Sequence, residues 1–353
     1  MDPTTLIPAT EPYQVQWWIF QALLSLGFLV HILLVNVMLG TTVMALVAGL
    51  GGKDDPPARA ISTKLPTTIA FTVNFGVVPL LFLQVLYGHF FYISDIIMGW
   101  FWLSVPFLVM FAYYMAYLFD FRYERLGQAR TLVLLLAAAC MTAVAFFFVN
   151  NLTMFLTPDR WLTYFENDRG TVLNWADPSL LPRVSHFLLA SLAVGGLAVA
   201  LLWSRGERAA RPGAQAHVRR GMRWFLLASV AQLAVGPWFL LTIRHDVMLL
   251  FLGGGGAHTA FFAAAMLGVA AVLYAGLARR PGLGAVAVVF TAAMMVGVRE
   301  LMRISYLEDF YRAWEVPSRG EYSPLAMFLV ALVLGIGVVA YVLKLARNAG
   351  KEA

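Results

Sequence analysis

Nine apolar runs, most of them near the length of a membrane-spanning helix, dominate this chain of 353 residues. A helix that crosses the hydrocarbon core of a bilayer needs about 20 mainly apolar residues, because lipid offers no partners to exposed backbone groups. The sequence therefore predicts an all-α, polytopic membrane bundle of about nine helices that forms one domain over residues 1–353. The runs cover residues 17–50, 66–93, 96–118, 131–156, 181–203, 222–242, 257–277, 283–302 and 324–345.

Composition excludes the other broad classes of protein. Hydrophobic residues make up 61% of the chain and charged residues 12%, against about 25% charged in soluble proteins. These values exclude a soluble globule, a disordered chain, a coiled coil and a disulfide-rich secreted scaffold. With Cys140 as the one cysteine, a disulfide, a thiolate metal cluster and covalent haem attachment are excluded as well.

The distribution of basic residues predicts the topology. Of the 25 Lys and Arg residues, 17 fall on the side that holds the loops after the odd-numbered runs and the carboxyl terminus. The positive-inside rule places that side in the cytoplasm and the amino terminus outside. The basic residues form no stripe interleaved with aromatics, which argues against nucleic acid as a partner. We expect no removable signal peptide, and we expect a multi-pass protein of the bacterial inner membrane whose first partner is the lipid bilayer.

Five of the six histidines fall in the predicted outer half of the membrane. His217 lies in the arginine-rich cytoplasmic loop and is interpreted as a solvated residue. A single histidine in an apolar helix is more often structural than functional, but five at a common depth favour a function. Zinc or copper has little support, whereas neutral imidazoles between apolar helices are typical axial ligands of haem iron. Haem b is therefore the expected cofactor, and the glycine run at 253–256 would let a flat ring approach the backbone, unless it is only a flexible loop. The five histidines are His31, His89, His186, His245 and His258.

Several short motifs occur in the order found in a known family. The chain resembles subunit I of the cytochrome bd quinol oxidase family over nearly its whole membrane part. The motifs are HxLxVxxxLG from His31 to Gly40, the segment 76–88, the end of the fourth run with Asn150, Met154 and Pro158, RVSH at 183–186 and ELMR at 300–303.

The resemblance implies roles for individual residues. In that family the counterparts of His31 and His186 are axial haem ligands, and the counterpart of Glu300 faces a high-spin haem b. A ligand from the seventh helix lies opposite the low-spin histidine, so His258 is predicted to pair with His186 as a bis-histidine site. His89 and His245 would form a second pair or replace weaker ligands. The arginines at the same level would hold haem propionates, or form ion pairs with nearby carboxylates and lipid headgroups: Arg183, Arg244, Arg299 and Arg303.

The chain departs from the family pattern in three places. Its third run has no carboxylate between residues 99 and 117, where the family has acidic residues for proton delivery. Ile304 follows Arg303 in place of the family's continuation, and the outer loop at 244–256 is short where the family has a long quinol-binding loop. The first two departures argue against oxygen reduction, and the short outer loop argues against a quinol site of the family's kind.

The sequence therefore predicts an electron-transfer subunit with two or three haem b groups. It would pass electrons between the quinone pool and a periplasmic redox protein such as a c-type cytochrome, together with other membrane subunits of a respiratory complex. The aromatic outer loops 158–181 and 305–322 would dock that protein, or would form an interfacial belt. Two alternatives stay open: a bd-type quinol:oxygen oxidoreductase subunit, and a membrane scaffold or transporter without haem.

Overall fold

The computed structural model describes residues 7–8, 10–51 and 55–352. The chain is 83% helical, and its described part has no strand, only an isolated bridge between Tyr13 and Ser318. Nine described helices are long and apolar enough to cross a membrane, which confirms the predicted all-α polytopic fold. They are α1 (Trp17–Leu50), α3 (Leu65–Ile97), α4 (Gly99–Phe121), α6 (Ala129–Phe155), α7 (Leu180–Trp203), α9 (Ala214–Thr242), α11 (Gly256–Leu277), α12 (Pro281–Leu307) and α13 (Ser323–Glu352).

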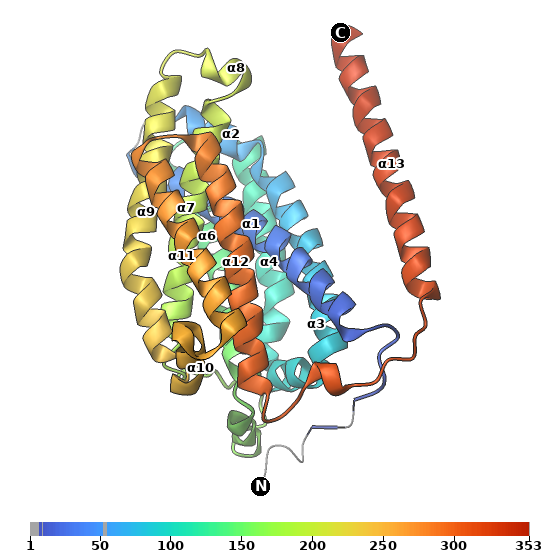
Figure 1. The fold of residues 1–353 in the computed structure, drawn as a ribbon. Coiled ribbons are helices and arrows are strands. Elements are labelled where there is room, and N and C mark those ends of the chain that lie inside the picture. The colour runs from blue at the N-terminus through green and yellow to red at the C-terminus, as the bar shows by residue number, and fades with distance from the viewer. Residues whose placement is uncertain (1–6, 9, 52–54, 353) are drawn as a thin grey trace.

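Eight of these helices form a bundle, and α13 stands apart from it (Figure 1). Within the bundle α1 packs against α3 and α7, α7 against α9, α4 against α6, and α11 against α12. Helix α1 has 34 residues and is about 51 Å long at 1.5 Å per residue, which exceeds the hydrocarbon thickness of about 30 Å. It crosses the bundle at a tilt (Figure 1).

Short helices close the two ends of the bundle. One end, at the top of Figure 1, carries α2 (Pro56–Ser62), α8 (Gly206–Ala209) and the one-turn helix α5 (Tyr123–Leu126). The other end carries the start of α1 and three elements in the loops: η2 (Pro158–Phe165), α10 (His245–Leu249) and the π-turn η3 (Leu250–Gly254). We refer to this second end as the outer end, following the predicted topology.

A strap between α12 and α13 lies along the amino-terminal segment at the outer end. This strap, residues 308–322, includes the short helix η4 (Ala313–Glu315). The backbone N–H of Tyr13 donates to Pro317 O at 2.9 Å, and the N–H of Arg319 donates to Tyr13 O at 2.7 Å. These bonds fix the start of α13, whose described side chains are nearly all exposed.

Several helices extend beyond the predicted apolar runs; α12, for example, ends at Leu307, whereas its run ends at residue 302. The break between the second and third apolar runs, at residues 94–95, is helical, since α3 continues to Ile97 and the chain turns at Met98. Asn151 Nδ2 donates to Asp95 Oδ1 at 2.8 Å within this stretch. Helix α9 begins eight residues before the predicted start of its apolar run, since the polar residues that precede the run are helical as well. His217, expected in a solvated loop, therefore lies in α9 with its ring 4.4 Å from that of Trp203.

Helices α1 and α7 meet at two facing glycines. A Cβ atom built on Gly195 would stand 2.6 Å from Gly40 Cα, and one on Gly40 would stand 2.9 Å from Gly195 Cα. Backbones approach this closely only where neither residue has a side chain. The glycine pair therefore sets the distance between the helix that carries His31 and the helix that carries His186.

We expect Gly195→Ala to destabilise the protein by about 1–3 kcal/mol, the usual cost of inserting a methyl group into a filled interface. The measurement is the free energy of unfolding in mixed micelles. Gly236→Ala in α9 is the matched control, because nothing lies within 4 Å of the added methyl group. A loss that is equal in the two variants would show that the α1–α7 contact is not the cause.

Candidate functional site

An ion-pair cluster lies near the outer end of α12. Arg303 Nη1 donates to Glu300 Oε2 at 2.7 Å, and Arg303 Nη2 donates to Oε1 at 3.1 Å. Arg299 Nη1 donates to the same Oε1 at 2.6 Å. Glu300 and Arg303 are buried, and the Arg299 side chain is 22% exposed. The carboxylate of Glu300 therefore has two cationic donors from its own helix, one of them bidentate.

Helices α1 and α3 complete this cluster. Gln21 Nε2 on α1 donates to Glu300 Oε2 at 2.8 Å, and the hydroxyl of Tyr87 on α3 donates to Gln21 Oε1 at 3.4 Å. The guanidinium of Arg303 lies 5.1 Å from the centre of the Tyr87 ring. Tyr87 has non-helical backbone angles, φ −137° and ψ 28°, which mark a kink in α3 beside the cluster. We refer to Gln21, Tyr87, Arg299, Glu300 and Arg303 as the Glu300 cluster.

Arg183 on α7 adds a further buried cation nearby. Its Nε donates to Ser179 Oγ at 2.9 Å, and its Nη2 contacts Met302 Sδ at 3.9 Å. The guanidinium lies 4.7 Å from the centre of the Phe239 ring. The carboxylate of Asp177 reaches Arg183 only through Ser179, whose hydroxyl donates to Asp177 Oδ1 at 2.6 Å. No described carboxylate bonds to Arg183 directly.

The charges at this level do not balance. The guanidinium groups of Arg183, Arg299 and Arg303 share one directly bonded carboxylate, that of Glu300, among the residues that the structure describes. Arg303 Nε is also buried without a described hydrogen-bond partner. Because charge within a membrane is costly unless it is paired, this level of the bundle has the electrostatics of an anion-binding site.

His186 lies one turn after Arg183 on α7 and is half-buried. Gln232 Nε2 on α9 donates to the backbone O of His186 at 2.7 Å, so this amide lies beside the imidazole. Both His186 Nδ1 and Gln232 Oε1 are buried and lack a described partner. A small rotation that let Nδ1–H donate to Gln232 Oε1 would satisfy both atoms and leave the lone pair on Nε2. That is the tautomer in which a histidine binds a metal.

His31 lies near the middle of α1 against α3. Its Nδ1 is 3.0 Å from the backbone O of Thr72 and can donate to it. The ring covers Gly76, where an added Cβ would stand 2.8 Å from His31 Cε1. A hydrogen bond from Nδ1–H to Thr72 O leaves the lone pair of His31 on Nε2, where it can bind a metal. One turn before His31, the centre of the Phe28 ring lies 4.0 Å from the guanidinium of Arg299, so this neighbouring turn of α1 contacts the Glu300 cluster.

His258 contacts α12 at the start of α11. Its Nε2 lies 2.9 Å from Ser305 Oγ, and its ring lies 5.1 Å from that of Phe251. No described contact joins His258 to His186, so their pairing stays a prediction. Ligation through Nε2 of His258 would require the ring to release Ser305.

The other two candidate histidines lie away from these contacts. His89 is half-buried on α3, and His245 is exposed at the first residue of α10. No described contact brings either of them to another candidate ligand. In the described part of the chain, no three His, Cys, Asp or Glu residues come together as ligands of a metal ion.

Arg244, expected at the same level as the other arginines, lies on the outer surface instead. It forms an ion pair with Asp246 at 2.6 Å and another with Asp309 at 3.8 Å. Its backbone N–H donates to the Tyr306 hydroxyl at 2.9 Å. The hydrogen bond from Arg244 lowers the pKa of Asp246 below its ordinary value, so that carboxylate is ionised at neutral pH. For Arg244 the described contacts are therefore ion pairs with carboxylates, one of the two roles that the sequence left open for these arginines.

Gln21, Gln232 and Ser305 were not singled out from the sequence, although each contacts a candidate residue in the structure. Gln21 and Gln232 are amides within long apolar helices. A polar residue inside a membrane span usually has a specific partner, and this signal could have identified both amides. Which partner each one has depends on helix packing, which no local pattern predicts.

The chain matches no model of a known protein family, and it matches no curated protein.

Proposed function

We propose that this chain is a haem b-binding electron-transfer subunit of a respiratory complex in a bacterial inner membrane. It passes electrons between the quinone pool and a periplasmic redox protein, and it works with other membrane subunits. The observation that carries this proposal is the excess of buried guanidinium groups beside His186 and the Glu300 cluster.

Haem b fits the residues at this level in charge and in ligand chemistry. Its two propionates are carboxylates. Arg183 bonds directly to no described carboxylate, and Arg303 shares the carboxylate of Glu300 with Arg299. Bidentate or stacked arginines are the usual partners of such groups. When bound through two imidazoles, a haem b iron carries one electron and has no open position for oxygen. A scaffold that binds no anion offers no comparable reason to bury these cations.

The histidines of this chain would hold and orient the group. A hydrogen bond from His186 Nδ1–H to Gln232 Oε1, two atoms without a described partner, would fix the tautomer of His186. The carbonyl of Thr72 can do the same for His31, so that each ring would keep Nε2 as a ligand atom. In this proposal Glu300 and Arg299 lie beside the haem site of His31. His258 is proposed as the second ligand opposite His186, with His89 and His245 as further candidates.

The test is a reduced-minus-oxidised optical spectrum of the purified protein. The proposal predicts the Soret and α bands of low-spin haem b. Spectra without these bands would reject the proposal and leave a scaffold or a transporter. A component that is sensitive to carbon monoxide would favour an oxidase instead.

We expect purified protein that is given a reduced quinol to consume oxygen slowly or not at all. Helix α4 spans Gly99–Phe121, and its first carboxylate, Asp120, comes only at its cytoplasmic end. This helix therefore has no series of carboxylates that could carry protons toward an oxygen-reducing centre. An oxygen electrode gives the rate, and turnover at the level of a dedicated oxidase would contradict this expectation.

A further inference from the structure

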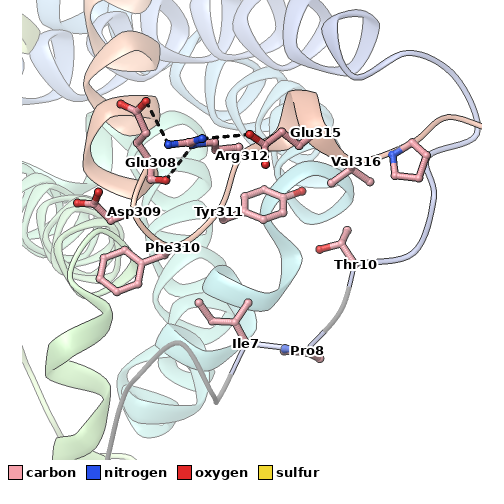
Figure 2. A pocket seen from close by; sticks show the side chains of 11 residues that line it. Ile7, Pro8, Thr10, Glu308, Asp309, Phe310, Tyr311, Arg312, Glu315 and Val316 are labelled. Carbon is pink, nitrogen blue, oxygen red and sulfur yellow. Dashed lines mark hydrogen bonds and ion pairs between the residues drawn. The ribbon is translucent and has the colours of Figure 1, made fainter.

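A hollow of about 680 Å³ lies at the outer end, between the strap and the amino-terminal segment. Figure 2 shows it from close by, with Glu308, Asp309, Tyr311 and Glu315 along the strap and Thr10 on the opposite side. We refer to it as the outer hollow. The functional site described above does not include these residues.

The outer hollow is acidic. Arg312 is the single basic residue among those that line it, and it bonds to two of the three carboxylates. Its Nη1 donates to Glu315 Oε1 at 3.1 Å, and its Nη2 lies 3.7 Å from Glu308 Oε1 (Figure 2). With three carboxylates against one guanidinium, the described lining carries a formal charge of −2 at neutral pH.

The outer end as a whole also carries a negative formal charge. Outside the helical spans, ten described carboxylates stand against five arginines there, a formal charge of −5. The opposite end of the bundle is rich in arginine. A surface field of one sign steers partners of the opposite sign and repels anionic headgroups. The carboxylates are Glu11, Asp159, Glu166, Asp168, Asp177, Asp246, Glu308, Asp309, Glu315 and Glu321, and the arginines are Arg160, Arg169, Arg244, Arg312 and Arg319.

A continuous set of contacts leads from the outer hollow to the Glu300 cluster. Tyr311 lines the hollow, and its ring centre lies 5.9 Å from that of Tyr87. Tyr87 in turn lies 5.1 Å from the guanidinium of Arg303, which is bonded to Glu300. Tyr13 holds the Tyr311 hydroxyl in a hydrogen bond. Two aromatic rings therefore separate the outer hollow from the buried charges.

We propose that the outer hollow is the docking surface of a soluble electron carrier with a basic rim around its redox group. This inference rests on the proposed function and names the partner and the place where it binds. Charge complementarity selects a basic protein over an acidic one or an anionic lipid. Docking over Tyr311 places the carrier at the start of the described set of contacts through Tyr87 to Arg303.

The test measures binding of mitochondrial cytochrome c, a lysine-rich probe, to the full chain in nanodiscs of zwitterionic phosphatidylcholine. We expect binding at low ionic strength that is lost in 0.5 M salt (about 4 Å Debye length), and lost when the probe's lysines are acetylated. The triple variant Glu308→Gln, Asp309→Asn, Glu315→Gln should weaken binding by about tenfold or more. The matched control, Asp159→Asn, Glu166→Gln, Asp168→Asn, removes three carboxylates from the same end outside the hollow and should have a much smaller effect.

Equal weakening in the two triple variants would overturn the proposal, because binding would then follow the charge of the whole face. Absence of binding at low salt would overturn it as well. Binding is measured independently of haem, so its failure is distinct from that of the proposed function. A preparation that holds haem but does not bind the probe overturns only the docking surface, whereas one without haem removes the proposed function.

Discussion

Glu300→Gln is expected to lower the free energy of unfolding by about 3–5 kcal/mol, the cost of removing one partner from a buried ion pair. The change leaves Arg299 and Arg303 without the carboxylate that now accepts their hydrogen bonds. Gln21 keeps an acceptor in the new amide, so the loss is mainly electrostatic. Denaturant titration in mixed micelles measures the change.

Glu308→Gln is the matched control for this measurement. Glu308 lies two turns later and forms an exposed ion pair with Arg312 at 3.7 Å. Exposed ion pairs contribute about 0–1 kcal/mol, so the control should unfold almost like the unmodified protein. Similar losses in the two variants would contradict the account of Glu300 as the carboxylate that balances buried cations.

The Glu300→Gln variant also tests whether Glu300 has a role beyond stability. In the proposed function Glu300 lies beside the haem site of His31, and His186 and His258 belong to another site. Glu300→Gln should therefore shift the spectrum or the redox midpoint of one haem and leave the His186 component intact. Unchanged spectra, haem content and midpoints would limit Glu300 to its ion pairs.

His186→Ala is expected to abolish one low-spin haem component completely, because an alanine offers the iron no ligand. If His258 is the opposite ligand, His258→Ala should remove the same component. Optical difference spectra of the purified variants measure the loss. Gln232→Leu provides a finer test, since loss of the amide beside His186 should shift that component without removing it.

His217→Ala serves as the control, because His217 lies against Trp203 near the start of α9, far along that helix from Gln232. It should leave every haem component in place. Retention of the full spectrum in His186→Ala would contradict the ligand assignment. Loss of different components in the His186 and His258 variants would contradict only their pairing.

The helical spans could be predicted from the sequence because lipid leaves the chain few choices. An apolar run of about 20 residues cannot leave its backbone groups without partners in the membrane, so it becomes a helix. The boundaries at α9 and at Met98 could not be predicted in the same way. Helix α9 begins before its apolar run, and α3 continues through Asp95, whose carboxylate accepts a hydrogen bond from Asn151 on a distant helix.

The candidate site could be predicted only where it depends on local spacing. Glu300 and Arg303 are three residues apart in α12, so a shared face follows directly from the helical period. The bond from Gln21 to Glu300 joins residues 279 positions apart and depends on how α1 meets α12. The packing of His31 on Gly76 and the contact of His258 with Ser305 are also between helices. No short motif contains that information.

Pyridine haemochrome quantification of the purified protein tests the central claim most directly, because it determines haem type and amount together. The account predicts haem b, with two or three groups per chain. Protein that is folded, as judged by its helical content, but contains no haem would contradict the account.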